Sequence, residues 1–190
     1  MTSFYKTADS FQQGSTTLPQ RYYVEDLLLR QEMENIFFNS WLCVGRSNEI
    51  IKIGEYKIIT IGNESLFIIK NEENKLKAFY NTCRHRGTRI CSKENGKYSK
   101  SIQCPYHGWT YDLSGKLIGA PNMDAVEQFN KDNYPLFPVG LIEWEGFILI
   151  NLSDNPSEFQ LEYKSIINRF AEWEIKDIEI YESKVYHVNC

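Results

Sequence analysis

The sequence lacks the features that would place it in a membrane or a secretory pathway. No apolar run approaches the roughly 20 residues of a membrane-spanning helix. The polar start of the chain has neither the apolar core of a signal peptide nor the Arg-rich character of a transit peptide. The chain has only 5 Cys, an odd number that suits a reducing compartment. We therefore predict a cytoplasmic protein with no membrane partner.

An excess of positive charge is also missing. The chain carries 21 Lys and Arg against 25 Asp and Glu, for a net charge of −4. This balance provides no electrostatic reason to expect nucleic acid as a partner. With 190 residues, of which 42% are hydrophobic and 14% aromatic, the chain can bury a core without disulfides.

Two short motifs each pair one cysteine with one histidine. A Rieske 2Fe-2S cluster is held by two Cys on one iron and two His on the other, so a loop that supplies one of each can contact both irons. Neutral imidazoles make such a cluster easier to reduce, with potentials of roughly −150 to +300 mV. The motifs are CRH at 83–85 and CPYH at 104–107, and the candidate metal ligands are Cys83, His85, Cys104 and His107.

Zinc is the competing interpretation, because Cys and His in fours also hold structural zinc. Zinc sites usually take Cys-x2-Cys on one arm and a pair of His or a second pair of Cys on the other. Both arms are mixed here, and one residue separates the ligands of the first. The spacing therefore favours the iron–sulfur cluster.

The surrounding residues resemble a known family. The stretches 81–90 (NTCRHRGTRI) and 103–119 (QCPYHGWTYDLSGKLIG) are similar to the N-terminal Rieske domain of the alpha subunits of bacterial Rieske non-heme iron oxygenases. That group includes ring-hydroxylating dioxygenases and enzymes that attack quaternary amines. The resemblance implies that Cys83 and Cys104 bind the buried iron, and His85 and His107 the outer one. It also implies no disulfide between the loops, because Tyr106 replaces the second-loop Cys of the respiratory type.

Five loop residues are expected to surround the cluster. Gly87 and Gly108 each closely follow a ligand His, where the backbone must turn sharply. Trp109 is expected under the second ligand loop, where it would exclude water or simply pack in the core. The hydroxyl of Tyr106 could donate to a sulfur, although packing at the rim is favoured. Arg86, with its neighbours Arg84 and Arg89, either hydrogen-bonds within the loop or forms a docking patch for an acidic electron donor.

The periodicity predicts a mainly β fold, a Rieske-type antiparallel sandwich or barrel with the cluster on two hairpin loops. Strands rich in Ile, Val, Phe and Tyr alternate with turn signals. Apolar residues at helical spacing predict a packing helix before them, from Leu29 to Trp41, and another after them, from Phe159 to Phe170. The predicted strands are 42–44, 56–61, 66–70, 76–80, 146–152 and 178–188.

We predict four parts: a flexible tail (1–18), an N-terminal helical segment (19–41), the Rieske domain (42–153), and a linker, helix and first strand of a truncated catalytic domain (154–190). Oxygen activation needs a mononuclear Fe(II) held by two His and a carboxylate. His187 is the only His that the cluster leaves free, so this iron is expected in the missing domain. The chain alone should pass electrons without hydroxylating a substrate.

The leading hypothesis is that the chain is the electron-transfer part of an oxygenase alpha subunit, an oxidoreductase when full length. The family resemblance implies a reductase or ferredoxin as electron donor. It also implies a homo-oligomer, usually a trimer, in which the acceptor is the catalytic domain of a neighbouring subunit. A free-standing Rieske ferredoxin and a zinc-stabilised binding module are the alternatives. Aromatic rings and methylated amines both remain open as substrates, with the loops slightly favouring the amine-attacking branch.

Overall fold

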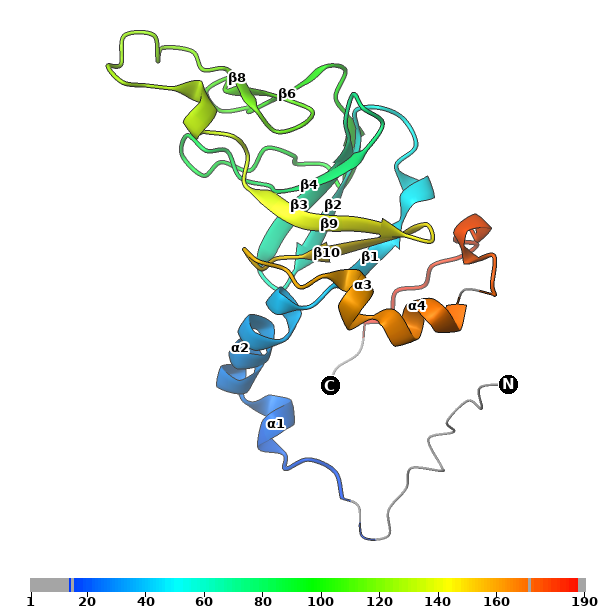
Figure 1. The fold of residues 1–190 in the computed structure, drawn as a ribbon. Helices are drawn as coiled ribbons and strands as arrows, with labels where there is room; N and C mark the ends of the chain where they lie inside the picture. Colours follow the sequence, from blue (N-terminus) through cyan, green and yellow to red (C-terminus); the bar gives the residue numbers. More distant parts are fainter. Residues whose placement is uncertain (1–13, 15, 171, 188–190) are drawn as a thin grey trace.

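The computed structural model describes residues 14, 16–170 and 172–187, and its centre is a pair of antiparallel sheets (Figure 1). The larger has seven strands in the order β1-β10-β9-β4-β3-β2-β5, and the smaller has the order β6-β7-β8. The mainly β prediction is therefore confirmed. The strands are β1 (Leu42–Arg46), β2 (Glu55–Ile61), β3 (Glu64–Lys70), β4 (Leu76–Tyr80), β5 (Asn95–Lys97), β6 (Ser101–Gln103), β7 (Thr110–Asp112), β8 (Leu117–Gly119), β9 (Pro138–Trp144) and β10 (Phe147–Asn151).

The core lies on both faces of the larger sheet, because β3 is buried on each side. Phe67 and Ile69 point into one hydrophobic cluster, and Leu66 and Ile68 point into another. Alternate residues of a strand face opposite sides of the sheet, so this four-residue apolar run fills two layers. The first layer also contains the buried side chains of the smaller sheet and both predicted ligand cysteines. The candidate site is therefore attached directly to the core.

The N-terminal helical segment differs from the predicted packing helix. It consists of α1 (Arg21–Val24), α2 (Asp26–Asn35) and the 3-10 turn η2 (Phe37–Asn39), and none of these contains a buried residue. Leu29 is 56% exposed and Ile36 is 54% exposed. In Figure 1 α1 and α2 extend away from the sheets. The side chain of Met33 in α2 lies close to Gly62. The apolar spacing thus predicted a helix correctly but its burial wrongly.

The C-terminal segment also departs from the prediction. The expected single helix is split at Tyr163 into α3 (Phe159–Glu162) and α4 (Lys164–Phe170). The predicted strand 178–188 is wrong for residues 178–187, which are not in a strand, and Val188 lies outside the described residues. Three further 3-10 turns lie in the chain described by the structure: η3 (Ser47–Glu49), η4 (Lys131–Asn133) and η5 (Ile175–Asp177), the last just before residue 178.

The guanidinium of Arg46 holds the start of this final segment on the sheet. Its Nη2 donates to the carbonyl oxygens of Ile175 and Ile178, each at 2.7 Å. These carbonyls are thus bonded to a side chain instead of a neighbouring strand. Most of the predicted tail 1–18 and the last residues up to Cys190 lie outside the described residues. No helix in the described part of the chain is long and apolar enough to cross a bilayer.

Candidate iron–sulfur site

The first ligand loop follows β4 directly and is closed by two backbone hydrogen bonds. The N–H of Cys83 donates to the carbonyl of Thr88 at 2.9 Å, and the N–H of Gly87 donates to the carbonyl of Cys83 at 3.0 Å. Gly87 has a φ of 72°, in the left-handed region that favours glycine. This turn reverses the chain within six residues and holds Cys83 and His85 on one loop.

The second ligand loop joins β6 to β7 and repeats the same backbone pattern. The N–H of Cys104 donates to the carbonyl of Trp109 at 2.8 Å, and the N–H of Gly108 donates to the carbonyl of Cys104 at 3.2 Å. Gly108 has a φ of 71°. The two loops are therefore equivalent turns, although the His follows its Cys by two residues in one and by three in the other.

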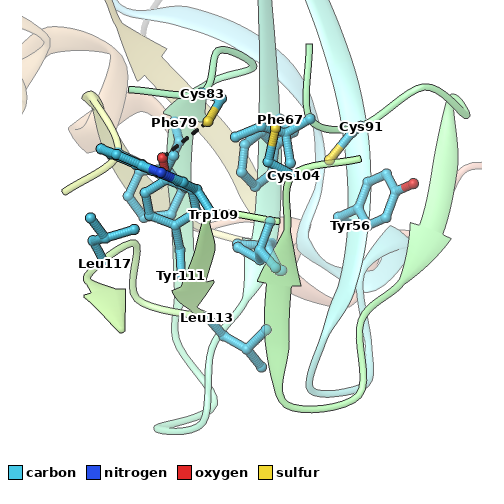
Figure 2. Close-up of a cluster of buried hydrophobic side chains, with 14 residues drawn as sticks. Tyr56, Phe67, Phe79, Cys83, Cys91, Cys104, Trp109, Tyr111, Leu113 and Leu117 are labelled. Carbon is cyan, nitrogen blue, oxygen red and sulfur yellow. Dashed lines mark hydrogen bonds between the residues drawn. The ribbon is translucent and has the colours of Figure 1, made fainter. Parts of the chain in front are cut away.

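The two predicted ligand cysteines lie together in the core. Cys83 is 2% exposed and Cys104 is 3% exposed, and their side chains are close enough to interact. Figure 2 shows both within the buried cluster. Burial raises the pKa of the Cys83 thiol above its ordinary value. Iron binding would therefore displace the proton of the Cys83 thiol.

The two predicted ligand histidines form a second, separate pair. The rings of His85 and His107 have centroids 4.6 Å apart and are inclined by 70°. The pKa of His85 is lowered by burial, by His107 and by the charge of Arg86. The lowered pKa favours the neutral imidazole, which is the form that binds a metal.

One buried ring nitrogen of this histidine pair lacks a hydrogen-bond partner. Nδ1 of His85 is inaccessible to solvent and has no hydrogen-bond partner. A buried polar atom without a partner is costly unless it binds something else. An imidazole nitrogen beside a second imidazole fits an iron at this position, with the sulfur pair holding the other iron. The four side chains thus fit the Rieske cluster.

The arrangement is one of two pairs rather than one converging set. Among the described residues, no group of three or more His, Cys, Asp or Glu side chains is placed to hold a single metal ion. A tetrahedral zinc site would require all four ligands around one point, whereas a two-iron cluster requires ligands at two poles.

Trp109 connects the two loops. Its indole is 2% exposed and stacks on the imidazole of His85, with centroids 4.9 Å apart and planes inclined by 7°. The rings of Phe129 and Tyr134 lie edge-on to the indole, each with its centroid 5.7 Å from the indole centroid. Trp109 closes the second turn with its backbone, and its indole covers the histidine of the first loop, a contact that the sequence did not predict.

Tyr111 is the residue that the sequence reasoning missed. Its hydroxyl lies 3.3 Å from Sγ of Cys83 (Figure 2) and accepts the backbone N–H of Arg84 at 3.1 Å. Burial raises the pKa of this hydroxyl, which therefore keeps its proton and could donate it to the sulfur of a Cys83 thiolate. The alternation of large apolar residues could have predicted that the Tyr111 side chain points inward, since Trp109, Tyr111 and Leu113 share one face and are all buried.

Tyr106 does not lie beside a ligand sulfur as Tyr111 does. Its side chain is 61% exposed, and its ring lies against His107 with centroids 3.8 Å apart. Of the two possibilities considered for this hydroxyl, the geometry corresponds to packing at the rim of the site.

The three arginines of the first loop have different environments. Arg84 is half-buried: its Nη1 donates to the carbonyl of Pro135 at 2.8 Å, and its guanidinium lies over the ring of Phe137. Arg86 and Arg89 are exposed. The Arg84 bond thus joins the first loop to the segment at Pro135 and does not close the loop on itself.

The buried side chain of Asn81 fastens the first loop at its base. Its Oδ1 accepts the N–H groups of Ile90 and Cys91 at 3.1 and 2.8 Å. Its Nδ2 donates to the carbonyl of Cys91 at 2.8 Å and to the hydroxyl of Ser65 at 3.2 Å. The amide thus joins both ends of the loop and ties them to β3.

We expect Asn81→Ala to destabilise the protein by about 2–4 kcal/mol, because it leaves buried N–H groups without partners. Urea unfolding of the full chain would measure this. Asn95→Ala, at an exposed position on β5, is the control and should change the unfolding free energy by less than about 0.5 kcal/mol. Equal stability of the two variants would contradict the role of Asn81.

Comparison with known proteins agrees with this geometry. The Rieske 2Fe-2S domain family matches residues 40–130. Residues 40–130 thus belong to the Rieske 2Fe-2S domain family. The relatives of this chain include the carnitine monooxygenase oxygenase subunit of Escherichia coli (strain K12), 38% identical over 148 residues, which are 78% of this chain and 39% of the relative. The glycine betaine monooxygenase oxygenase subunit of Chromohalobacter salexigens is 34% identical over 176 residues, 92% of this chain and 39% of the relative.

Solved structures show the same Rieske fold. The apo form of the quaternary ammonium Rieske monooxygenase CntA superposes with a TM-score of 0.82 at 34% identity, over 87% of this chain and 49% of that one. Naphthalene 1,2-dioxygenase from Rhodococcus sp. superposes with a TM-score of 0.70 at 28% identity, over 75% of this chain and 33% of that one. The Rieske chain described here thus spans about two fifths of the length of the curated oxygenase subunits it matches.

Proposed function

We propose that Cys83 and Cys104 bind one iron of a Rieske 2Fe-2S cluster, and that His85 and His107 bind the other. The observation that carries this assignment is the buried Nδ1 of His85, which has no hydrogen-bond partner and lies in a pair with His107. When bound, the cluster supplies one-electron transfer at a potential of roughly −150 to +300 mV.

The surrounding residues prepare the site for this chemistry. The Tyr111 hydroxyl would donate to Sγ of a Cys83 thiolate and so stabilise negative charge on the sulfur. The stacked indole of Trp109 fixes the plane of His85 and keeps water from that side. Gly87 and Gly108 allow the two turns that bring the ligands together, and Arg86 contributes a positive charge that is felt at His85.

This assignment is tested on the purified chain, isolated anaerobically. We expect two irons and two inorganic sulfides per chain, and a Rieske-type EPR signal after reduction by one electron. The reduction midpoint should lie in the range given above, well above the about −400 mV of clusters with four Cys ligands. Colourless protein that contains zinc and no sulfide would contradict the assignment.

For the whole protein we propose an oxygenase. A reductase or ferredoxin would be the electron donor, and the mononuclear iron of a neighbouring subunit in a cytoplasmic homotrimer the acceptor. Residues 42–153 would be the Rieske domain, and residues 154–190 the linker and start of the catalytic domain. The relatives named for carnitine and glycine betaine favour a quaternary ammonium substrate, because they match this chain at up to 38% identity. Turnover of carnitine, glycine betaine and biphenyl by the full-length protein would decide between amine and aromatic substrates.

A further inference from the structure

The stretch of chain between β8 and β9 places aromatic rings beside the candidate cluster. In Figure 1 it is the yellow-green stretch that joins the smaller sheet to the larger one. The rings of Phe129 and Tyr134 stack with centroids 5.1 Å apart and planes inclined by 26°. Both rings lie edge-on to the indole of Trp109. This ring pair therefore supports the indole that stacks on His85.

The backbone at the end of this stretch is bonded to both sheets. The N–H of Leu136 donates to the carbonyl of Gly115 at 2.8 Å, and the carbonyl of Phe137 accepts the N–H of Tyr80 at 3.0 Å. Gly115 lies in the turn between β7 and β8, and Tyr80 is the last residue of β4. A side chain that binds residues 134–137 is therefore attached to a fixed part of the fold.

Arg84 attaches the first ligand loop to these residues. Its Nη1 donates to the carbonyl of Pro135 at 2.8 Å. The central carbon of its guanidinium lies 4.0 Å from the ring centroid of Phe137 and 5.8 Å from that of Tyr134. The backbone N–H of Arg84 is also bonded, to the hydroxyl of Tyr111. Both the main chain and the side chain of the residue that precedes a ligand histidine are thus held.

These contacts form a closed circuit. Arg84 contacts Tyr134, and Tyr134 contacts Trp109. Trp109 in turn stacks on His85, the residue that follows Arg84. Local opening of a loop costs more free energy when more contacts must break. The circuit therefore opposes any movement of the His85 ring away from the indole.

We propose that Arg84 is a positioning residue for the iron–sulfur cluster, which acts through Tyr134 and Trp109 to fix the ring plane of His85. The inference rests on the proposed cluster and adds how one of its imidazole ligands is held. The planar guanidinium suits this role because it can donate a hydrogen bond and lie over an aromatic ring at the same time. Arg89 carries the same charge on the same loop but is exposed, so it provides a comparison in which only the charge is shared.

The test is a double-mutant cycle on the rate at which the full chain releases iron to excess EDTA under anaerobic conditions. Arg84→Met and Tyr134→Leu each open the circuit, and each should release iron about tenfold faster than the wild type. The double variant should be no faster than the faster single variant, because the second change acts on a circuit that is already open. Multiplied effects, about 100-fold in the double variant, would show independent packing contacts and overturn the proposal.

The EPR spectrum of the reduced protein separates positioning from stability. Arg84→Met should broaden the range of hyperfine couplings from the ligand nitrogens, because the His85 ring is less fixed. Arg84→Lys keeps the charge and one donor but loses the planar group, so it should lie between Arg84→Met and the wild type. If Arg84→Met does not fold, Arg84→Lys and Tyr134→Leu provide the same comparison.

Arg89→Met is the matched control, and it should keep the wild-type spectrum and release rate. Equal effects of Arg84→Met and Arg89→Met would show that charge alone matters and would overturn the proposal. A lower stability to urea in Arg84→Met, with the spectrum and the release rate unchanged, would also overturn it. Wild-type protein that holds no cluster would instead contradict the proposed function itself.

Discussion

Cys104→Ala should yield a colourless protein with no inorganic sulfide. Its side chain is 3% exposed and is paired with Cys83 in the core, so no exposed residue can reach the same place to substitute for it. A cluster iron that loses one of its two protein ligands is left with incomplete coordination. Iron and sulfide analysis and the visible spectrum of anaerobically isolated protein measure the loss.

Cys91→Ala is the matched control for this experiment. Cys91 is 1% exposed and belongs to the same hydrophobic cluster, but it lies outside both ligand turns. Burial raises the pKa of its thiol to about 11, so it remains protonated at neutral pH. The control should bind a full complement of iron and sulfide. Loss of the cluster in Cys91→Ala, or its retention in Cys104→Ala, would refute the ligand assignment.

Tyr111→Phe should lower the reduction potential of the cluster by about 60 mV. The hydroxyl lies 3.3 Å from Sγ of Cys83 and would donate to it once the thiolate binds iron, and this bond would strengthen when reduction adds negative charge to the sulfur. A loss of about 1.4 kcal/mol of this differential stabilisation corresponds to about 59 mV in a one-electron couple. Phe keeps the ring in the core, so the fold should be maintained. A redox titration followed by EPR measures the midpoint.

Tyr98→Phe removes a comparable hydroxyl from a different sulfur. The oxygen of Tyr98 lies 3.6 Å from Sγ of Cys91, which is not a predicted ligand. This variant should keep the midpoint within about 10 mV of the wild type, because the lost hydrogen bond does not reach the iron. Equal shifts in the two variants would show that general changes in core polarity, rather than the bond to Cys83, control the potential.

The helical segments show where sequence patterns failed. Leu29, Ile36 and Phe37 recur at helical spacing, and the segment does begin as a helix, but these side chains remain exposed. The spacing of apolar residues reports which side chains share a face, and it does not show whether another element covers that face. The predicted strand after Ile175 failed for a related reason: the sequence does not show what the backbone will bond to, and the carbonyl of Ile175 accepts from Arg46 of a distant strand.

The strands show the opposite case. β1, β2, β3, β4 and β10 lie where runs of Ile, Val, Phe and Tyr predicted them. β5 and β6 have only three residues each, too few for an alternating pattern to be recognised. β9 contains Pro138 and Gly140, which are typical of strand edges and turns rather than strand interiors.

The identity of the candidate ligands could be read from the chain itself, because a cluster that needs two thiolates and two imidazoles requires those residue types at short spacing on two loops. The tertiary structure was needed for everything that tunes and holds them. Tyr111 reaches Cys83 and Trp109 reaches His85 across separate loops, and Asn81 joins the base of the first loop to β3. Contacts of this kind depend on how the elements pack. No local sequence pattern predicts a contact between residues that are distant in sequence.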